Sequence, residues 1–218
     1  MKKNKILLTT LLALFAVNMT AQEKGQLIDL LPEGVVLNVN SERKMGKQKN
    51  VIVVGTPQKG YKAFFAATDS EHGEELWVTD GTKAGTHMVK DIVPGTHGSN
   101  PSYLGRLNDK ALFSAFTNEK GQETWVSDGT EEGTFMLADT YLVGDGDPKG
   151  FMQINETQAV FSATSDESAE YDPDNGMQQW VWITDGTVEG TKFVKDIKVD
   201  NPGKENTNLN YPYVRVGR

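Results

Sequence analysis

Short apolar segments alternate with polar turns along most of this chain. One set of segments is rich in Phe and Ala, and it recurs at residues 62–67, 110–115 and 158–163. A second set carries a tryptophan and runs into a polar Asp-Gly-Thr step. The segments are four to eight residues long and are bounded by Gly, Asp, Asn or Pro, which is typical of β-strands. No segment shows a sustained helical period, so the pattern predicts an all-β protein.

The tryptophan segment is the clearest repeat. Residues 75–82 read Glu-Leu-Trp-Val-Thr-Asp-Gly-Thr and are followed by a Gly-Thr pair, and two close copies come later in the chain. Trp77, Trp125 and Trp182 follow one another at intervals of roughly 50 residues, and spacing in this range indicates a repeat architecture. The third unit carries about nine extra residues around 170–176, an insertion that a surface loop tolerates.

Each unit is predicted to hold four short antiparallel strands. In the first unit these are residues 62–67, the tryptophan segment, a segment ending near 90–92, and 102–107. Four strands in about 48 residues is the size of one propeller blade. Closed propellers have about four to eight blades, so we expect an incomplete or partial β-propeller of about three four-stranded antiparallel repeats. The repeat region is expected at 51–218, with units near 62–109, 110–157 and 158–218.

This pattern resembles a known family. Glu-Leu-Trp-x-x-Asp-Gly-Thr-x-x-Gly-Thr, followed by Val-Lys-Asp-Ile-x-Pro-Gly, is similar to the ELWxxDGT repeats of secreted bacterial proteins, and residues 75–101 match it almost throughout. The second unit departs at Thr124 and at 138–140, and the third has Trp180-Val181 before its tryptophan. The resemblance covers roughly residues 50–218. It implies a propeller-like fold, export from the cell and no established catalytic residues.

Three units would leave sheet edges uncovered, and the sequence allows three ways to cover them. Proteins of the family are usually much longer, so the favoured explanation is that this chain is a fragment of a longer array. Alternatively, N-terminal strands join the last strand in a fourth blade, or the ring closes by oligomerisation. Residues 211–216 resemble the segment 100–107, which leads into the next repeat in the earlier units.

The N-terminus reads as a secretory signal peptide over residues 1–21. Three lysines precede an apolar run at 6–17, and a polar step leads to a cleavage site after Ala21. The apolar run is too short to span a bilayer, which favours a cleaved signal over a membrane anchor. We therefore expect an exported protein that is periplasmic, at the cell surface or extracellular. Residues 22–50 are expected to form lead-in strands, at 27–31 and 35–39, and an exposed loop at 41–50.

The charge and cysteine content exclude several classes of partner and site. The chain has 22 Lys and Arg against 30 Asp and Glu, a net charge of −8. Signal cleavage would remove three lysines and give about −11. An acidic chain is a poor match for nucleic acid or for an anionic membrane surface, so neither is an expected partner. The chain has no cysteine, which excludes disulfides, a thiol nucleophile and thiolate metal sites.

One aspartate recurs before the Gly-Thr of every unit. A Ca²⁺ ligand in each blade is one interpretation. The favoured alternative is turn chemistry, in which Asp accepts a backbone hydrogen bond two residues on and Gly supplies a positive φ. A repeated turn needs these residues in every unit, whereas catalysis usually needs a residue once. The residues concerned are Asp80, Gly81, Asp128, Gly129, Asp185 and Gly186.

The aromatic residues have two interpretations as well. The repeated Trp77, Trp125 and Trp182 are expected to fill the space between neighbouring blades, although exposed tryptophans would stack on sugar rings. Other aromatic residues lie outside the repeat and are better candidates for a glycan contact. They are Trp180, Tyr171, Tyr211 and Tyr213.

Two acidic turns are weak Ca²⁺ candidates because they carry closely spaced oxygen ligands. Neither matches a full EF-hand loop, and Asp/Asn/Gly turns explain both. Three histidines, His72, His87 and His97, show no metal-binding spacing and are expected at the surface. The acidic candidates are Asp145, Asp147, Asp172 and Asp174.

No catalytic motif or cofactor motif is recognisable, and Ca²⁺ is the one candidate ion. The sequence therefore favours a secreted, non-catalytic repeat module that binds a protein or glycan in adhesion or surface assembly. The alternative is an extracellular propeller enzyme acting on polysaccharide, because 30 acidic residues always offer carboxylate pairs. An enzyme would need polar residues that occur in one unit only and converge.

Overall fold

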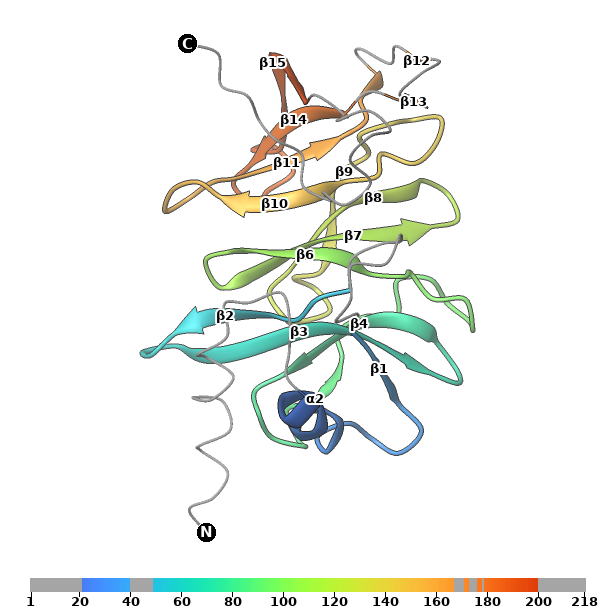
Figure 1. Cartoon of the computed structure of the whole chain (residues 1–218), viewed down its shortest axis with the longest axis vertical. Coiled ribbons are helices and arrows are strands. Elements are labelled where there is room, and N and C mark those ends of the chain that lie inside the picture. The colour runs from blue at the N-terminus through green and yellow to red at the C-terminus, as the bar shows by residue number, and fades with distance from the viewer. Residues whose placement is uncertain (1–20, 40–48, 167–170, 173–175, 178, 200–218) are drawn as a thin grey trace.

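The structure is a computed structural model that describes residues 21–39, 49–166, 171–172, 176–177 and 179–199. Three antiparallel sheets lie one above another along the long axis, with helix α2 at one end and strand β15 at the other (Figure 1). Strands dominate these residues, and α2 is the only α-helix among them. The all-β prediction is therefore confirmed.

The first sheet has five strands, because β1 and β2 share one edge of β3. Its strands are β1 (Val36–Asn38), β2 (Ile52–Thr56), β3 (Gly60–Asp69), β4 (Gly73–Thr79) and β5 (His87–Met88). The second sheet is β6 (Ser102–Leu107), β7 (Lys110–Thr117), β8 (Gly121–Ser127) and β9 (Phe135–Ala138). The third is β10 (Lys149–Gln153), β11 (Ala159–Ala163), β14 (Gln179–Thr184) and β15 (Lys192–Val199). A small hairpin pairs β12 (Tyr171–Asp172) with β13 (Gly176–Met177).

All three sheets share one register. In each, the phenylalanine of the second strand lies opposite the repeated tryptophan, and the pairs are Phe65–Trp77, Phe113–Trp125 and Phe161–Trp182. The extra residues of the third unit lie between β11 and β14 and include the β12–β13 hairpin. The insertion therefore leaves the tryptophan register unchanged.

The sheets are out of phase with the units expected from the sequence. Segment 102–107, expected as the last strand of the first unit, is β6, and it pairs with β7 of the second sheet. A tight turn at 108–109 joins these two strands, so hairpin pairing assigns β6 to the following sheet. The third strand of the first unit was expected to reach 90–92, but β5 ends at Met88.

Side chains from facing sheets interlock between them. Phe64 and Val78 of the first sheet pack with Phe113 and Trp125 of the second in one buried cluster. Strand β6 lies beside both β2 and β10. The strands that begin the repeated hairpin of each sheet, β2, β6 and β10, are therefore neighbours. The second and third sheets thus turn their Phe–Trp faces toward the preceding sheet.

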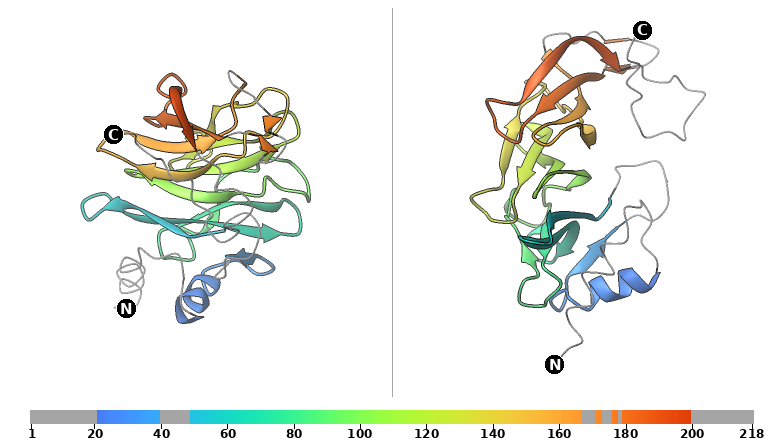
Figure 2. Two further views of the ribbon diagram at one scale, coloured as in Figure 1. Left: turned by 45° about the horizontal axis from the view of Figure 1, so that its top comes forward. Right: turned by 90° about the vertical axis from the view of Figure 1, so that its left-hand side faces the viewer.

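No sheet precedes the first one among the described residues, and helix α2 (Ala21–Ile28) lies in that place (Figure 2). Leu27 and Leu31 pack on Phe65 and Trp77, and all four are buried. The expected strand at 27–31 is therefore wrong, because the helix and the turns that follow it bring both leucines, four residues apart, to one face. The expected strand at 35–39 is confirmed in part by β1.

The sheets form a curved row that does not close into a ring within the residues placed by the structure (Figure 2). The predicted signal peptide lies outside the described residues except for Ala21, and most of the expected loop at 41–50 also lies outside them. Among the helices described, none is long and apolar enough to cross a membrane.

Candidate functional site

The Asp-Gly-Thr turn that follows each tryptophan strand is a closed network of hydrogen bonds. In the first unit, Asp80 Oδ1 accepts from Thr82 N at 2.9 Å and from Thr82 Oγ1 at 2.7 Å. Thr82 Oγ1 then accepts from Gly85 N at 3.0 Å, and the Thr86 hydroxyl donates to Thr82 O at 2.6 Å. Gly81 has φ +88°, a backbone conformation that favours glycine.

The second and third units repeat this network almost unchanged. Asp128 and Asp185 accept from the threonine two residues on, with hydroxyl distances of 2.7 Å in both cases. The glycine that closes the turn cannot be replaced without strain, because a Cβ at Gly133 would lie 2.2 Å from Asp128 Oδ1. Turn chemistry therefore accounts for the recurring Asp, Gly and Thr.

Lysines tie these turns to the neighbouring sheet. Lys62 Nζ, at the start of β3, donates to Asp128 O in the second unit at 2.9 Å. Lys90 Nζ donates to Thr134 O of the same turn at 3.0 Å. Lys110 holds the position equivalent to Lys62, and a Cβ at Gly186 in the third unit would lie 3.7 Å from its Nζ. The turns thus serve as contacts between sheets.

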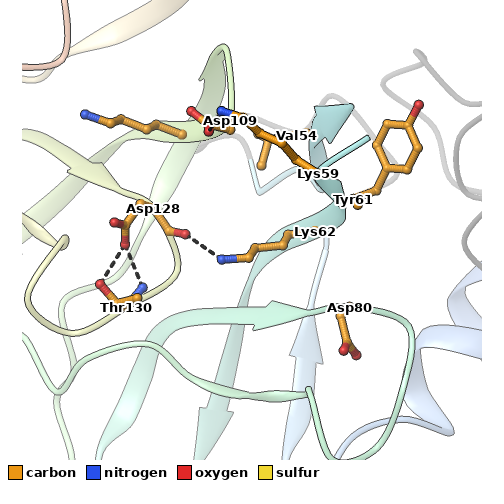
Figure 3. A pocket seen from close by; sticks show the side chains of 11 residues that line it. Val54, Lys59, Tyr61, Lys62, Asp80, Asp109, Asp128 and Thr130 are labelled. Atoms are coloured by element: carbon orange, nitrogen blue, oxygen red, sulfur yellow. Dashed lines mark hydrogen bonds and ion pairs between the residues drawn. The ribbon is translucent and has the colours of Figure 1, made fainter. Parts of the chain in front are cut away.

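An open cavity of about 650 Å³ lies at this end of the first two sheets (Figure 3). The β2–β3 hairpin, the start of β7 and two Asp-Gly-Thr turns line it. Lys59 and Asp109 form an ion pair of 3.0 Å across its rim, and the Lys62–Asp128 contact crosses it elsewhere. Tyr61, in the same β2–β3 hairpin, also borders the cavity, but its side chain points away from the Lys62–Asp128 contact.

Charges of both signs surround this cavity. The hydrogen bond from Lys59 lowers the pKa of Asp109 below its usual value. Burial opposes ionisation of Asp128, but hydrogen bonds from Thr130 and the nearby lysines outweigh it and lower the pKa of that carboxyl. Both aspartates are therefore ionised at neutral pH, so the cavity presents carboxylates and ammonium groups side by side.

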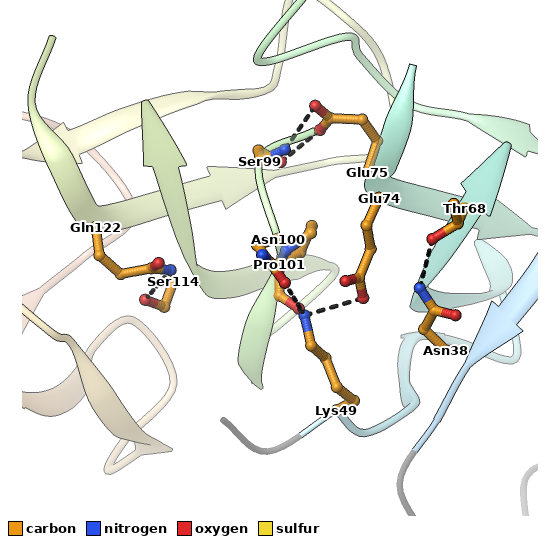
Figure 4. Close-up of polar contacts among 10 residues, drawn as sticks. All are labelled: Asn38, Lys49, Thr68, Glu74, Glu75, Ser99, Asn100, Pro101, Ser114 and Gln122. Carbon is orange, nitrogen blue, oxygen red and sulfur yellow. Dashed lines mark hydrogen bonds and ion pairs between the residues drawn. The ribbon is translucent and has the colours of Figure 1, made fainter. Parts of the chain in front are cut away.

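Two buried glutamates, which sequence reasoning missed, hold the crossovers between sheets. Glu75 is fully buried and accepts hydrogen bonds from Val93 N at 3.1 Å and Ser99 N at 2.9 Å, and also from the Ser99 hydroxyl (Figure 4). Lys49 lies nearby and pairs with Glu74 at 2.9 Å. The signal that could have found Glu75 is its recurrence two residues before the tryptophan in the first two units.

Glu123 has the same role between the second and third sheets. It is also fully buried and accepts from Thr140 N, Thr140 Oγ1 and Gly146 N at 2.8–2.9 Å. Burial raises the pKa of Glu75 and of Glu123 to about 7, against the opposing effect of these donors. Their burial and hydrogen bonds assign them a structural role.

The third unit lacks this glutamate. Trp180 takes the equivalent position, is buried, and makes an edge contact with Phe193 at 5.6 Å between ring centroids. Strand β15 pairs along β14 as far as Gln179–Val199, whereas β5 is two residues long and β9 is four. Burial also removes Trp180 as a surface contact for glycans, which corrects that expectation.

The repeated tryptophans do not form an exposed stacking surface. Trp77 and Trp125 are buried, against α2 and between the first two sheets respectively. Trp182 is half-buried and stacks on Phe161 at 6.1 Å between ring centroids. Tyr211 and Tyr213 lie outside the described residues, and the side chain of Tyr171 is not placed.

The Ca²⁺ candidates are not brought together where the structure places them. Asp145 Oδ1 accepts from Gln122 N at 2.8 Å, and Asp147 has φ +48° in the crossover to β10. The side chain of Asp172 is not placed, and Asp174 lies outside the described residues. Across the ranges that the structure covers, no group of three or more His, Asp or Glu side chains is arranged to hold a metal ion.

The three histidines remain apart from the cavity. His72 pairs with Asp69 at 2.9 Å in the β3–β4 hairpin, and that hydrogen bond raises the pKa of the imidazole. His87 and His97 are exposed, as expected.

Comparison with known proteins finds no matching family model, no matching curated protein and no matching solved structure.

Proposed function

We propose that the chain is an exported, non-catalytic module that binds a protein or glycan partner, in adhesion or surface assembly. In this proposal the three sheets are blades of an incomplete propeller of the ELWxxDGT type. Their common register and face-to-face packing support that assignment. The basic and apolar N-terminal stretch supports export.

The observation that carries the proposal is the cavity between the first two sheets. Its rim includes Lys59 and Asp109, which the repeated turn does not require. Tyr61 and Asp109 occupy equivalent positions in successive units, so the repeat leaves this position free to vary. Charged and polar groups around an open hollow suit a ligand with several hydroxyl or charged groups.

The carboxylates support binding rather than catalysis. Asp128 and Asp185 use Oδ1 in their own turns, and Glu75 and Glu123 are buried among backbone donors. A glycosidase instead needs two carboxyl groups facing one sugar across a cleft. The recurring acids are engaged in holding the fold.

The test is binding to immobilised neutral β-glucan and acidic galacturonan oligosaccharides, measured by surface plasmon resonance. We expect at least one class to bind, and Lys59→Ala and Asp109→Ala each to weaken it tenfold or more. Lys120→Ala is the matched control, since Lys120 also pairs with an aspartate, at 2.9 Å, but beyond the far end of β7.

Two outcomes would contradict the proposal. Binding that neither Lys59→Ala nor Asp109→Ala affects would exclude the cavity as the site. Release of reducing ends from a bound polysaccharide would show catalysis and favour the enzyme alternative.

A further inference from the structure

The outer face of the third sheet is apolar and only partly covered. The faces that the first two sheets turn toward the next sheet each carry four apolar side chains, none more than 5% exposed. They are Val54, Phe64, Val78 and Val89 in the first sheet, and Leu107, Leu112, Val126 and Leu137 in the second. The shared register places Ile154, Val160, Ile183 and Val194 at the equivalent positions of the third sheet. Ile154 is 47% exposed and the other three are half-buried.

Met152 widens this surface. It lies opposite Val160, which in turn lies opposite Ile183, and its side chain is 58% exposed. We call these five residues, Met152, Ile154, Val160, Ile183 and Val194, the terminal face. It lies at the end of the row opposite α2 (Figure 1). A contiguous apolar surface at the end of a soluble domain marks an interaction site.

The terminal face of one chain has one matching surface on a second copy of that chain. Within the chain, such a face is covered by the Phe–Trp face of the next sheet. In a second copy, Leu27 and Leu31 cover the Phe–Trp face of the first sheet, and the other two Phe–Trp faces lie inside the row. The apolar sheet face that stays accessible among the described residues is the terminal face itself. Contact between copies is therefore isologous, with the same surface of both copies meeting about a two-fold axis.

Charges at the edges of the terminal face suit a two-fold axis that runs along the strands. Lys192 lies opposite Ile183 at the start of β15 and is exposed at one edge. Glu156 is exposed at the other edge, in the β10–β11 turn, at the same end of the sheet. Rotation about this axis places β10 of one copy over β15 of the other. Each Glu156 then faces a Lys192, so opposite charges meet at both edges of the contact.

We propose that the terminal face joins two copies of this chain in a two-fold dimer, with Val160 of each copy on Ile183 of the other. The β2–β3 and β10–β11 turns lie at the same end of the strands, so the candidate cavities of both copies open at one end of the dimer (Figure 1). The dimer does not depend on binding at the cavity. If the proposed function holds, two sites at one end allow both to engage one partner.

Size-exclusion chromatography with light scattering tests the dimer. We expect twice the mass of one chain for the native protein and the mass of one chain for Met152→Asp, which places a charge in the terminal face. Ile28→Asp is the matched control and should stay dimeric, since Ile28 is 53% exposed on α2 at the other end of the row. Thermal melts followed by circular dichroism distinguish a lost contact from a lost fold.

Charge reversal tests the two-fold arrangement without altering the apolar contact. Glu156→Lys or Lys192→Glu alone places like charges at both edges, so each should weaken self-association fivefold or more at low ionic strength. An equimolar mixture of the two variants restores opposite charges at both edges. We expect this mixture to form a mixed dimer as readily as the native chain forms its own.

The contrary results are equally definite. A native chain that stays monomeric, or a dimer that Met152→Asp leaves intact, would overturn the proposal. Assemblies that grow beyond two copies would show head-to-tail contact instead. A mixture of the charge variants that associates no better than either variant alone would exclude the two-fold arrangement.

Discussion

The first two sheets and the third share a register but end in different ways. Glu75 and Glu123 collect three donors each from the crossover, and their sheets end in the short strands β5 and β9. The third unit has Trp180 at this position, and β15 runs on for eight residues. In both units that lead into a following sheet, a buried carboxylate therefore accompanies the crossover. This carboxylate accepts hydrogen bonds from backbone N–H groups of the crossover that would otherwise be buried without a partner.

The largest difference in stability between the second and third sheets is expected when their repeated tryptophans are replaced. Trp125 lies in the core between two sheets, so Trp125→Ala should leave a cavity and lower the free energy of unfolding by about 3–5 kcal/mol. Trp182→Ala should cost less, because Trp182 is only half-buried. Chemical denaturation of both variants measures the contrast. Equal losses would show that the third sheet is packed as tightly as the second.

The stability of the first two sheets, which contain Glu75 and Glu123, should depend on pH in a way that the third sheet does not. The pKa of each buried glutamate is raised from 4.5 to about 7 in the folded state, so the folded protein binds more protons than the unfolded chain between these values. The contribution of each carboxyl to the free energy of unfolding is therefore greatest below pH 4.5. It falls as pH rises toward 7, by about 3 kcal/mol for each carboxyl.

The variants Glu75→Gln and Glu123→Gln isolate this effect, since glutamine keeps the shape and does not titrate. Each should flatten the fall in unfolding free energy between pH 4.5 and 7, followed by urea denaturation at several pH values. An unchanged slope in both variants would show that the donors, rather than burial, control ionisation of the two carboxyls.

The turns provide a comparison in which all units should behave alike. A Cβ would lie 2.2 Å from Asp128 Oδ1 at Gly133 and 1.9 Å from Asp185 Oδ1 at Gly190. Gly133→Ala and Gly190→Ala should therefore each cost about 1–3 kcal/mol, because the added methyl group overpacks the turn. Gly25→Ala is the control: it has open space in helix α2 and should gain about 0.5–1 kcal/mol. Thermal unfolding of the three variants checks the order.

The smallest effect is expected at the cavity rim. Lys59 and Asp109 are both well exposed, so loss of their ion pair in Lys59→Ala should cost less than about 1 kcal/mol. A stability loss of that size, measured by denaturation, would allow the binding results for this variant to be read without a folding correction. A loss well above that limit would show that the pair holds the first two sheets together.

Much of the fold was predictable because its signals are local. The strands carrying Phe65 and Trp77 follow from short apolar segments between turn residues. The role of Asp80 follows from a hydrogen bond to a residue two positions on. The cavity was not predictable, because Lys59 and Asp109 come from different sheets and meet only when two hairpins lie side by side.

The sequence by itself determined the strands, their repeated register and the Asp-Gly-Thr turns, because each depends on side-chain spacing and backbone geometry within a few residues. Only the tertiary structure decided that β6 belongs with β7, that α2 covers Trp77, and that Glu75 is buried among backbone donors. The physical reason is that pairing partners and burial depend on surfaces brought together from distant parts of the chain, and the local pattern carries no record of which surface will meet which.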